Sequence, residues 1–311
     1  MPEIPKLFQK LDTKDFELAI QTLHLASLAL PAYGKTYEKI STKMKEQADR
    51  LKEILIETIA HNHPEYPSQI PFIKYDACLQ FLSYFLNKDN DGKIYTLNYD
   101  LLLYWTIMRG LENNFFDQEA NDGFGRESEY ENGEFNISGY VTWQGDGNAR
   151  NQNVHYLHGA LHLFDRGANV EKFTWIDTGE RLLEQTRKAL KENLFPLFVA
   201  EGKSDKKLER IAHSGYLYHS FKNFSGVMRT GRKDSSPCLF TYGVSFGEND
   251  SHIFNKISKG NIKKIFVGIY GDHNSNSNKK IIESIKTIQR KRKFGDLDVE
   301  YFESESAKVW G

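Results

Sequence analysis

The chain has 311 residues, with 41 basic and 42 acidic side chains and a formal net charge of -1. This balance excludes the basic field of a general nucleic-acid binder, so we expect no nucleic-acid partner. Its two cysteines, Cys78 and Cys238, exclude a four-cysteine zinc module and provide no disulfide framework. The N-terminus lacks an apolar signal region, and no run reaches the roughly 18 apolar residues of a membrane span. We therefore expect a cytoplasmic protein without membrane contact.

Residues 1–90 predict a helical subdomain or insert. Apolar residues recur at three- and four-residue intervals over 15–30, and a longer helical pattern rich in Lys and Glu covers 36–61. Prolines follow, and His61 and His63 beside them are expected at the surface. Residues 75–86 are apolar almost all round at helical length, which is typical of a helix buried between others.

Residues 91–311 predict an α/β domain. A β-prone run at 94–98 leads into an apolar helix at about 99–108, and residues 110–153 form a long polar loop. Strands are next expected at 171–176 and 195–200, and helices at 178–193 and, more weakly, 205–224. The end of the chain alternates regularly, with strands at 236–245, 263–270 and 299–302 and helices at 250–258 and 279–293. This alternation predicts a doubly wound, mostly parallel, Rossmann-like sheet.

Residues 154–164, VHYLHGALHLF, hold three of the ten histidines: His155, His158 and His162. Imidazole titrates near neutrality, so it suits proton transfer or metal binding. Alternating apolar residues favour a hairpin with Gly159 at its turn, in which each histidine could simply be a hydrogen-bonded core residue. A metal-dependent hydrolase with the three histidines as ligands is an alternative. Against it, His155 and His158 would point to opposite faces of a strand.

Three apolar strands end in polar residues: TLNYD at 96–100, YLHG at 156–159 and TYGVSFGEND at 241–250. Doubly wound sheets bind ligands at strand ends of this kind. Gly243 and Ser245, ahead of a helix capped near Asp250, would present backbone N–H groups and a hydroxyl to a phosphate or ribose. On spacing alone, a tight turn also explains Gly243.

In this order and at these separations, the three segments resemble the sirtuin-like NAD-consuming family, in which a T-x-N-x-D strand end, an H-G turn and a G-x-S strand end line one NAD pocket. The resemblance is to divergent stand-alone bacterial NAD hydrolases, including antiphage effectors, and covers about residues 93–310. It implies hydrolysis of NAD, as substrate, to nicotinamide and ADP-ribose, with no metal. By the same resemblance, Asn98 would position the attacking water and His158 would act as general base. The other residues implied to contact NAD are Thr96, Asp100, Gly159, Gly243, Ser245 and Asp250.

Two departures separate the sequence from that family. Family members begin with an apolar strand and a G-x-G-x-S turn that cradles the pyrophosphate. Here the helical region comes first, and the G-x-G pairs at 123/125 and 145/147 follow no apolar strand. A start further upstream, a natural truncation or a cradle supplied from elsewhere would account for this. The absence of a four-cysteine module argues against protein deacylation.

The first departure supports an alternative interpretation, a non-catalytic NAD- or nucleotide-binding sensor or partner subunit. By analogy with the family, we also expect homo-oligomers or a partner from a defence system.

Overall fold

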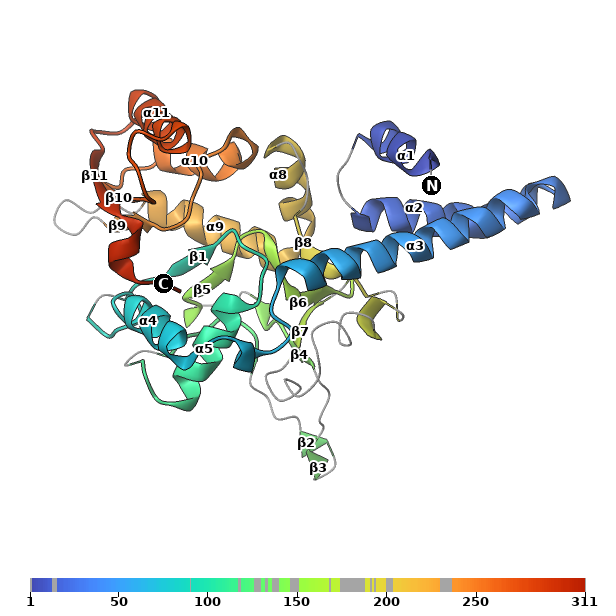
Figure 1. Ribbon diagram of the computed structural model, residues 1–311, viewed down its shortest axis with the longest axis horizontal. Coiled ribbons are helices and arrows are strands. Elements are labelled where there is room, and N and C mark those ends of the chain that lie inside the picture. Colours follow the sequence, from blue (N-terminus) through green and yellow to red (C-terminus); the bar gives the residue numbers. More distant parts are fainter. Residues whose placement is uncertain are drawn as a thin grey trace.

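A computed structural model of the chain shows a mixed α/β protein, with helices at the N-terminus and alternating strands and helices towards the C-terminus (Figure 1). The residues described are 2–12, 16–89, 91–116, 119–125, 130–131, 134–135, 140–145, 151–167, 169–173, 188–190, 192, 194–199, 204–229 and 237–310.

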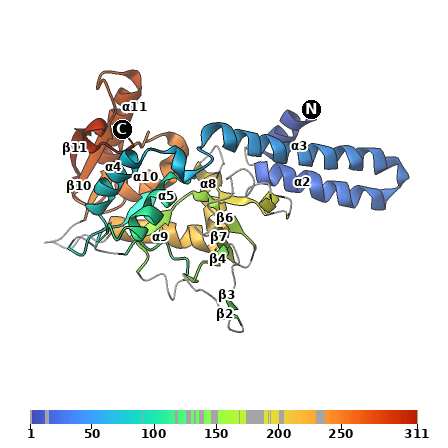
Figure 2. The same cartoon turned by 60° about the horizontal axis from the view of Figure 1, so that its bottom comes forward.

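The N-terminal region is built from helices, as the apolar periodicity predicts. Helices α2 (Phe16–Ala29) and α3 (Glu38–Asn62) form a hairpin that extends away from the rest of the molecule (Figure 2). An apolar cluster that includes Ile20 and Leu51 joins this hairpin to α1. The remaining elements are α1 (Glu3–Leu11), η1 (Leu30–Tyr33), η2 (Lys35–Tyr37), η3 (Pro67–Gln69) and α4 (Phe72–Ser83).

Strand β1 (Ile94–Thr96) opens the α/β part and pairs in parallel with β5 (Val154–Tyr156). The register sets Thr96 beside Tyr156, so the two strands end at the same edge. Helix α5 (Leu102–Glu112) follows β1, which confirms the predicted strand-to-helix passage.

A second sheet is antiparallel and has the strand order β4-β7-β6-β8. Its strands are β4 (Tyr140–Thr142), β6 (Gly159–Asp165), β7 (Val170–Phe173) and β8 (Pro196–Phe198). The predicted hairpin around Gly159 is wrong, because β5 pairs with β1 whereas β6 pairs with β7 and β8. The chain changes sheets at Gly159, whose φ is 79°. The polar stretch 110–153 supplies β4 and the short pair β2 (Tyr130–Glu131) and β3 (Glu134–Phe135).

The C-terminal part alternates strand and helix as predicted. Strands β9 (Cys238–Thr241), β10 (Lys264–Ile269) and β11 (Asp298–Glu303) form a parallel sheet in the order β11-β10-β9. The helices of this part are α8 (Ser204–His213), α9 (Gly215–Arg229), α10 (Ser251–Ser258) and α11 (Asn276–Arg290). The short helix η6 (Glu248–Asp250) precedes α10, and η7 (Ser304–Ala307) follows β11. The weak helical pattern at 205–224 therefore corresponds to two helices.

The main apolar core joins the two parallel strand groups. It includes Val154 of β5, Phe224 of α9, and Ile265 and Val267 of β10. Tyr95 of β1 packs on Phe224 with its ring centroid 5.1 Å away. The same core includes Leu157, which follows β5, and Leu97 and Val244, which follow β1 and β9, pack against it.

Two further expectations concern the chain as a whole. Within the described ranges, no helix has both the length and the apolarity needed to cross a bilayer. Cys78 is a buried free thiol and Cys238 an exposed one, in accord with the lack of a disulfide framework. The helix predicted at 178–193 lies mostly outside the described residues.

Candidate functional site

The ends of β1 and β5 bring two of the three predicted segments together. The backbone N–H of Leu157 donates to the carbonyl of Thr96 over 2.9 Å, and the N–H of Leu161 donates to the carbonyl of Tyr99 over 2.8 Å. The TLNYD and YLHG segments therefore stay side by side beyond the paired strands.

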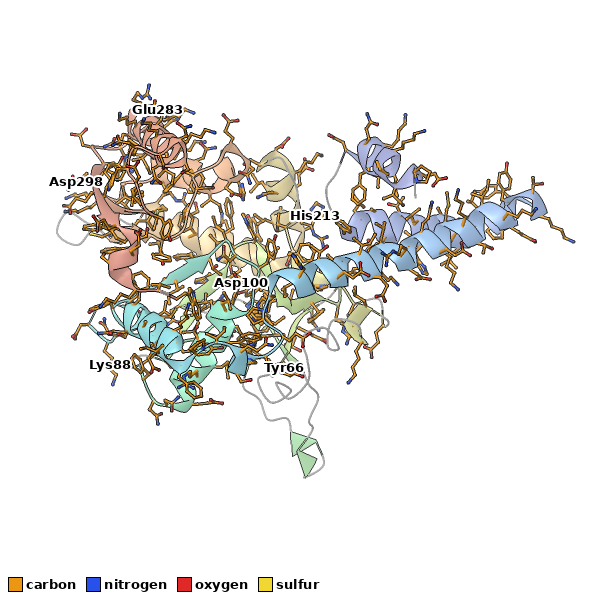
Figure 3. The ribbon with its side chains drawn as sticks, viewed as in Figure 1. Tyr66, Lys88, Asp100, His213, Glu283 and Asp298 are labelled. Carbon is orange, nitrogen blue, oxygen red and sulfur yellow. The ribbon has the colours of Figure 1, made fainter. Side chains whose placement is uncertain are left out.

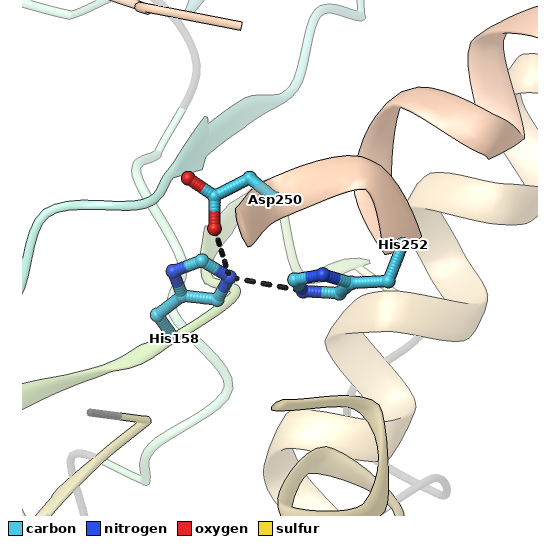
Figure 4. A group of neighbouring side chains, drawn as sticks. All are labelled: His158, Asp250 and His252. Atoms are coloured by element: carbon cyan, nitrogen blue, oxygen red, sulfur yellow. Dashed lines mark hydrogen bonds and ion pairs between the residues drawn. The ribbon is translucent and has the colours of Figure 1, made fainter. Parts of the chain in front are cut away.

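His158 is the point at which the third segment joins them. Its Nε2 lies 3.1 Å from Nε2 of His252 and 3.8 Å from Oδ1 of Asp250 (Figure 4). A hydrogen bond to the backbone of Leu97 raises the pKa of His158, and because Nε2 faces His252, we assign this bond to Nδ1. His158 thus connects the end of β1 with the start of α10.

A chain of polar contacts continues from His252 to α8. Oγ of Ser204 accepts a hydrogen bond of 2.7 Å from the His252 backbone N–H and lies 3.0 Å from His252 Nδ1. With the Ser204 hydroxyl donating to Nδ1, His252 donates from Nε2 to His158, and His158 donates from Nδ1 to the Leu97 carbonyl. Every ring nitrogen of the histidine pair then has a partner.

Asp250 also forms an ion pair with Lys207, whose Nζ lies 2.6 Å from Asp250 Oδ1. Both side chains are largely buried, so each charge needs the other to offset its lost hydration. The pair fixes the carboxylate within reach of His158.

Burial dominates the electrostatics of the two histidines. It lowers the pKa of His158 to about 3, with Lys207 lowering it further and Asp250 opposing the shift. Burial also lowers the pKa of His252 to about 4, and here too the carboxylate of Asp250 opposes the shift. Both imidazoles are therefore neutral at pH 7. A neutral imidazole can accept a proton or bind a metal ion through its nitrogen.

His158, Asp250 and His252 are also a possible metal-binding group. Their donor atoms all lie within 4.8 Å of one another, and no other three His, Cys, Asp or Glu side chains among the described residues converge in this way. The cluster can therefore move a proton or hold a cation.

Side chains of the TLNYD segment fix its own backbone. Oγ1 of Thr96 accepts a 3.0 Å hydrogen bond from the N–H of Asn98, and Oδ1 of Asp100 accepts one of 2.9 Å from the N–H of Leu102 at the start of α5. Figure 3 shows Asp100 near the centre of the molecule, beside the end of α3. Asn98 is exposed at the end of the strand.

His63 supports the same segment from α3, and its predicted surface position is wrong. It is buried, and its Nε2 accepts a 2.9 Å hydrogen bond from the backbone N–H of Leu101. Its ring meets Trp105 edge-on with centroids 4.9 Å apart. Burial lowers its pKa, so the ring stays neutral and can accept this bond.

Gly243 and Ser245 follow β9 and are both exposed. Gly243 has a φ of 66°, and a Cβ there would meet no atom within 4 Å, so the backbone conformation and not crowding favours glycine. The end of β9 therefore presents accessible backbone and a hydroxyl.

His155 and His162 are core residues that point away from His158. Nδ1 of His155 lies 3.1 Å from Nε2 of Gln152, and its ring stacks on Tyr95. His162 stacks on Tyr104 with centroids 4.3 Å apart, and no described atom hydrogen-bonds its ring nitrogens. The three histidines of the segment therefore do not form the ligand set considered as an alternative.

Sequence reasoning missed His252, Ser204 and Lys207. His252 is 94 residues from His158, so no spacing within one segment could pair them. The available signal was its position two residues after Asp250, in the first turn of a helix that follows a strand end.

A family model described as "Domain of unknown function (DUF4917)" matches residues 1–310. Comparisons with curated proteins and with solved structures found no match.

Proposed function

The chain belongs to the DUF4917 family, and from the geometry around His158 we propose that it hydrolyses NAD to nicotinamide and ADP-ribose. The observation that carries the proposal is that three segments far apart in sequence meet at this one side chain. His158 bonds the backbone of Leu97 and lies 3.1 Å from His252, next to Asp250. The resemblance to NAD hydrolases rests on these same three segments. Segments that resembled that family only by chance would have no reason to meet in the fold.

The chemistry suits these side chains. Water attacks C1′ of the nicotinamide ribose, the glycosidic C–N bond breaks, and its electron pair leaves with nicotinamide, which is a good leaving group because the bound ring is cationic. Water replaces His252 as the donor to Nε2 of His158, and the proton of the water passes to that nitrogen. The Asp250 carboxylate, 3.8 Å away, stabilises the imidazolium that forms. The amide of Asn98, which donates and accepts at once, holds the water.

The remaining residues hold the ligand or the site. Gly243 and Ser245 face the phosphates and the adenosine ribose with accessible backbone and a hydroxyl. Thr96 and Asp100 keep the TLNYD backbone in place through their hydrogen bonds to Asn98 and Leu102. Gly159 provides the turn that carries His158, and Asp250 acts on His158.

We also propose that the parallel pair β1–β5 and the parallel sheet β9–β11 are two parts of one doubly wound, Rossmann-like arrangement. The shared core and the common location of the three strand ends support it. The resemblance to antiphage NAD hydrolases extends the proposal to a cytoplasmic defence role, with homo-oligomers or a defence partner.

The test is NAD consumption by the purified chain, followed as nicotinamide release by chromatography, beside His158→Ala and Asn98→Ala. Each substitution should lower the rate about a hundredfold or more, as expected for loss of a general base or of the group that positions water. His162→Phe is the matched control, because it alters a buried histidine of the same segment that lies outside the site. It should leave the rate unchanged.

Each outcome has a defined meaning. A wild-type chain that binds NAD in calorimetry without cleaving it would be a sensor or partner subunit, which is the alternative function. Cleavage that persists in His158→Ala at the wild-type rate would contradict the assigned base.

A further inference from the structure

The Nε2 atoms of His158 and His252 lie 3.1 Å apart. Two facing nitrogen lone pairs would repel at this distance, so in the neutral pair one nitrogen, that of His252, carries a proton and the other accepts it in a hydrogen bond. A metal ion can replace this proton and bind a lone pair of each ring.

The distances fit a tetrahedral transition-metal ion. Zinc–nitrogen bonds of about 2.0–2.1 Å place two ligand nitrogens about 3.3–3.4 Å apart. The observed Nε2–Nε2 distance of 3.1 Å and Nε2–Oδ1 distance of 3.8 Å lie within a few tenths of an ångström of that spacing. The donor atoms that the three side chains offer all lie within 4.8 Å of one another, so a rotation of the Asp250 carboxylate towards His252 completes the site. Two imidazoles and one carboxylate leave a fourth position open, as in catalytic zinc sites, whereas Mg²⁺ and Ca²⁺ prefer oxygen ligands.

Both imidazoles also have the orienting partners that metal-bound histidines need. The backbone carbonyl of Leu97 accepts a hydrogen bond from His158, assigned to Nδ1, and Oγ of Ser204 lies 3.0 Å from Nδ1 of His252. On metal binding, His252 moves its proton from Nε2 to Nδ1, where Ser204 Oγ accepts it. Such outer partners fix ring orientation and raise ligand basicity.

We infer that His158, Asp250 and His252 form a binding site for a divalent transition-metal ion such as Zn²⁺, and that the bound ion inhibits NAD cleavage by occupying Nε2 of His158. The binding site stands on the geometry alone, and its inhibitory effect rests on the proposed function. The ion is a regulator of the site, since it takes the lone pair that the base needs. Lys207, paired with Asp250 Oδ1, limits the affinity and keeps the site reversible.

The inference differs from the expectation of no metal drawn from the resemblance. The alternative of a metal hydrolase placed its ligands among His155, His158 and His162, whereas His252 lies outside that segment on α10.

The test is a Co²⁺ titration of the chelator-treated full chain, followed by the visible absorption bands of tetrahedral cobalt, with Zn²⁺ as competitor. Wild type should bind one ion per chain with these bands. His252→Gln and Asp250→Asn should each weaken binding at least about a hundredfold, because even outer-shell changes cost about 10- to 100-fold. The control His162→Phe should bind as wild type does.

Binding and inhibition are read separately. An absent saturable cobalt band, or unchanged affinity in both ligand variants, overturns the site. Should circular dichroism show that His252→Gln is unfolded, the double variant Asp250→Asn/Lys207→Met, which removes a ligand without leaving a buried unpaired charge, decides the matter. One equivalent of Zn²⁺ should abolish nicotinamide release, reversibly with chelator. Cobalt binding without any NAD cleavage would overturn the proposed function and leave the metal site standing, whereas cleavage that Zn²⁺ does not slow would overturn the inhibition.

Discussion

His158 and His162 are four residues apart, both are buried, and burial lowers the pKa of both, yet their surroundings differ. Both ring nitrogens of His158 have partners, Leu97 directly after β1 and His252 of α10. The ring of His162 lies flat on Tyr104 and edge-on to Tyr156, and within the described part of the chain nothing bonds its nitrogens. A shifted pKa alone therefore does not mark a functional histidine. The groups that contact its ring nitrogens distinguish it.

Gly159 separates the two environments. His158 closes the turn after β5, where its ring faces the loop and helix that follow β9, whereas His162 lies within β6 among apolar and aromatic side chains. A histidine before the turn at Gly159 thus belongs to the candidate site, whereas a histidine after the turn packs in the core of a strand.

Gly159→Ala should have the largest effect on this contrast. An added Cβ would lie 1.9 Å from the carbonyl oxygen of Leu197, at a φ of 79° that alanine avoids. Backbone strain and the clash together should lower the free energy of unfolding by about 3 kcal/mol or more. Urea denaturation measures it.

Gly167→Ala is the matched control for that substitution. Its φ of 82° is similar, but a Cβ there meets nothing within 4 Å, so only the strain of about 1–2 kcal/mol remains. Equal losses in the two variants would show that contact with β8 does not constrain the turn.

His162→Phe should change how stability depends on pH. The folded state keeps His162 neutral, so its pKa lies well below that of the unfolded chain, about 6.5. As pH falls below 6.5, only the unfolded state takes up the proton, and stability is lost progressively down to the folded pKa. At pH 4.5 this one group accounts for up to about 2.7 kcal/mol. His162→Phe should recover that amount in urea denaturation at pH 4.5 and little at pH 7.5.

The exposed His273 supplies the comparison for this measurement. The stability of His273→Gln at pH 4.5 and pH 7.5 is the reference against which that of His162→Phe is compared. A His162→Phe variant that loses as much stability on acidification as wild type would place the acid sensitivity in other groups.

Much of the fold follows from local pattern. The apolar periodicity predicted α2, α3 and α4, and the alternation after residue 236 predicted the parallel strands β9, β10 and β11 and the helices between them. The hairpin at Gly159 was predicted wrongly because alternation and a glycine describe a turn between strands but not their partners. Strand pairing depends on which sheet has a free edge, which is a property of the whole chain.

The candidate site was predictable only in part. The strand ends of TLNYD, YLHG and TYGVSFGEND carried a local signal, and the fold brings Leu97, His158 and Asp250 together. His252 carried only the weak signal of its place two residues after Asp250, and Ser204 carried none, because histidines and serines near helix starts are common. Their importance arises from distances across the fold. His63 was placed at the surface because the prolines beside it suggested a loop, whereas Leu101 and Trp105 bury it.

Ser204 is the last group in the chain of contacts that runs from His158 through His252 and that His162 lacks. Of the stability changes predicted for this contrast, that of Ser204→Ala should be the smallest. The variant removes the acceptor of the His252 backbone N–H, and a net loss of about 1 kcal/mol in urea denaturation is expected. Ser306→Ala removes an exposed serine hydroxyl with a purely local bond and should cost less.

Because Ser204 also holds Nδ1 of His252, Ser204→Ala should bind Co²⁺ about 10- to 100-fold more weakly than wild type. Unchanged cobalt affinity with lowered stability would mean that Ser204 anchors only the start of α10, and that the orientation of His252 comes from its packing against His158 and Phe221.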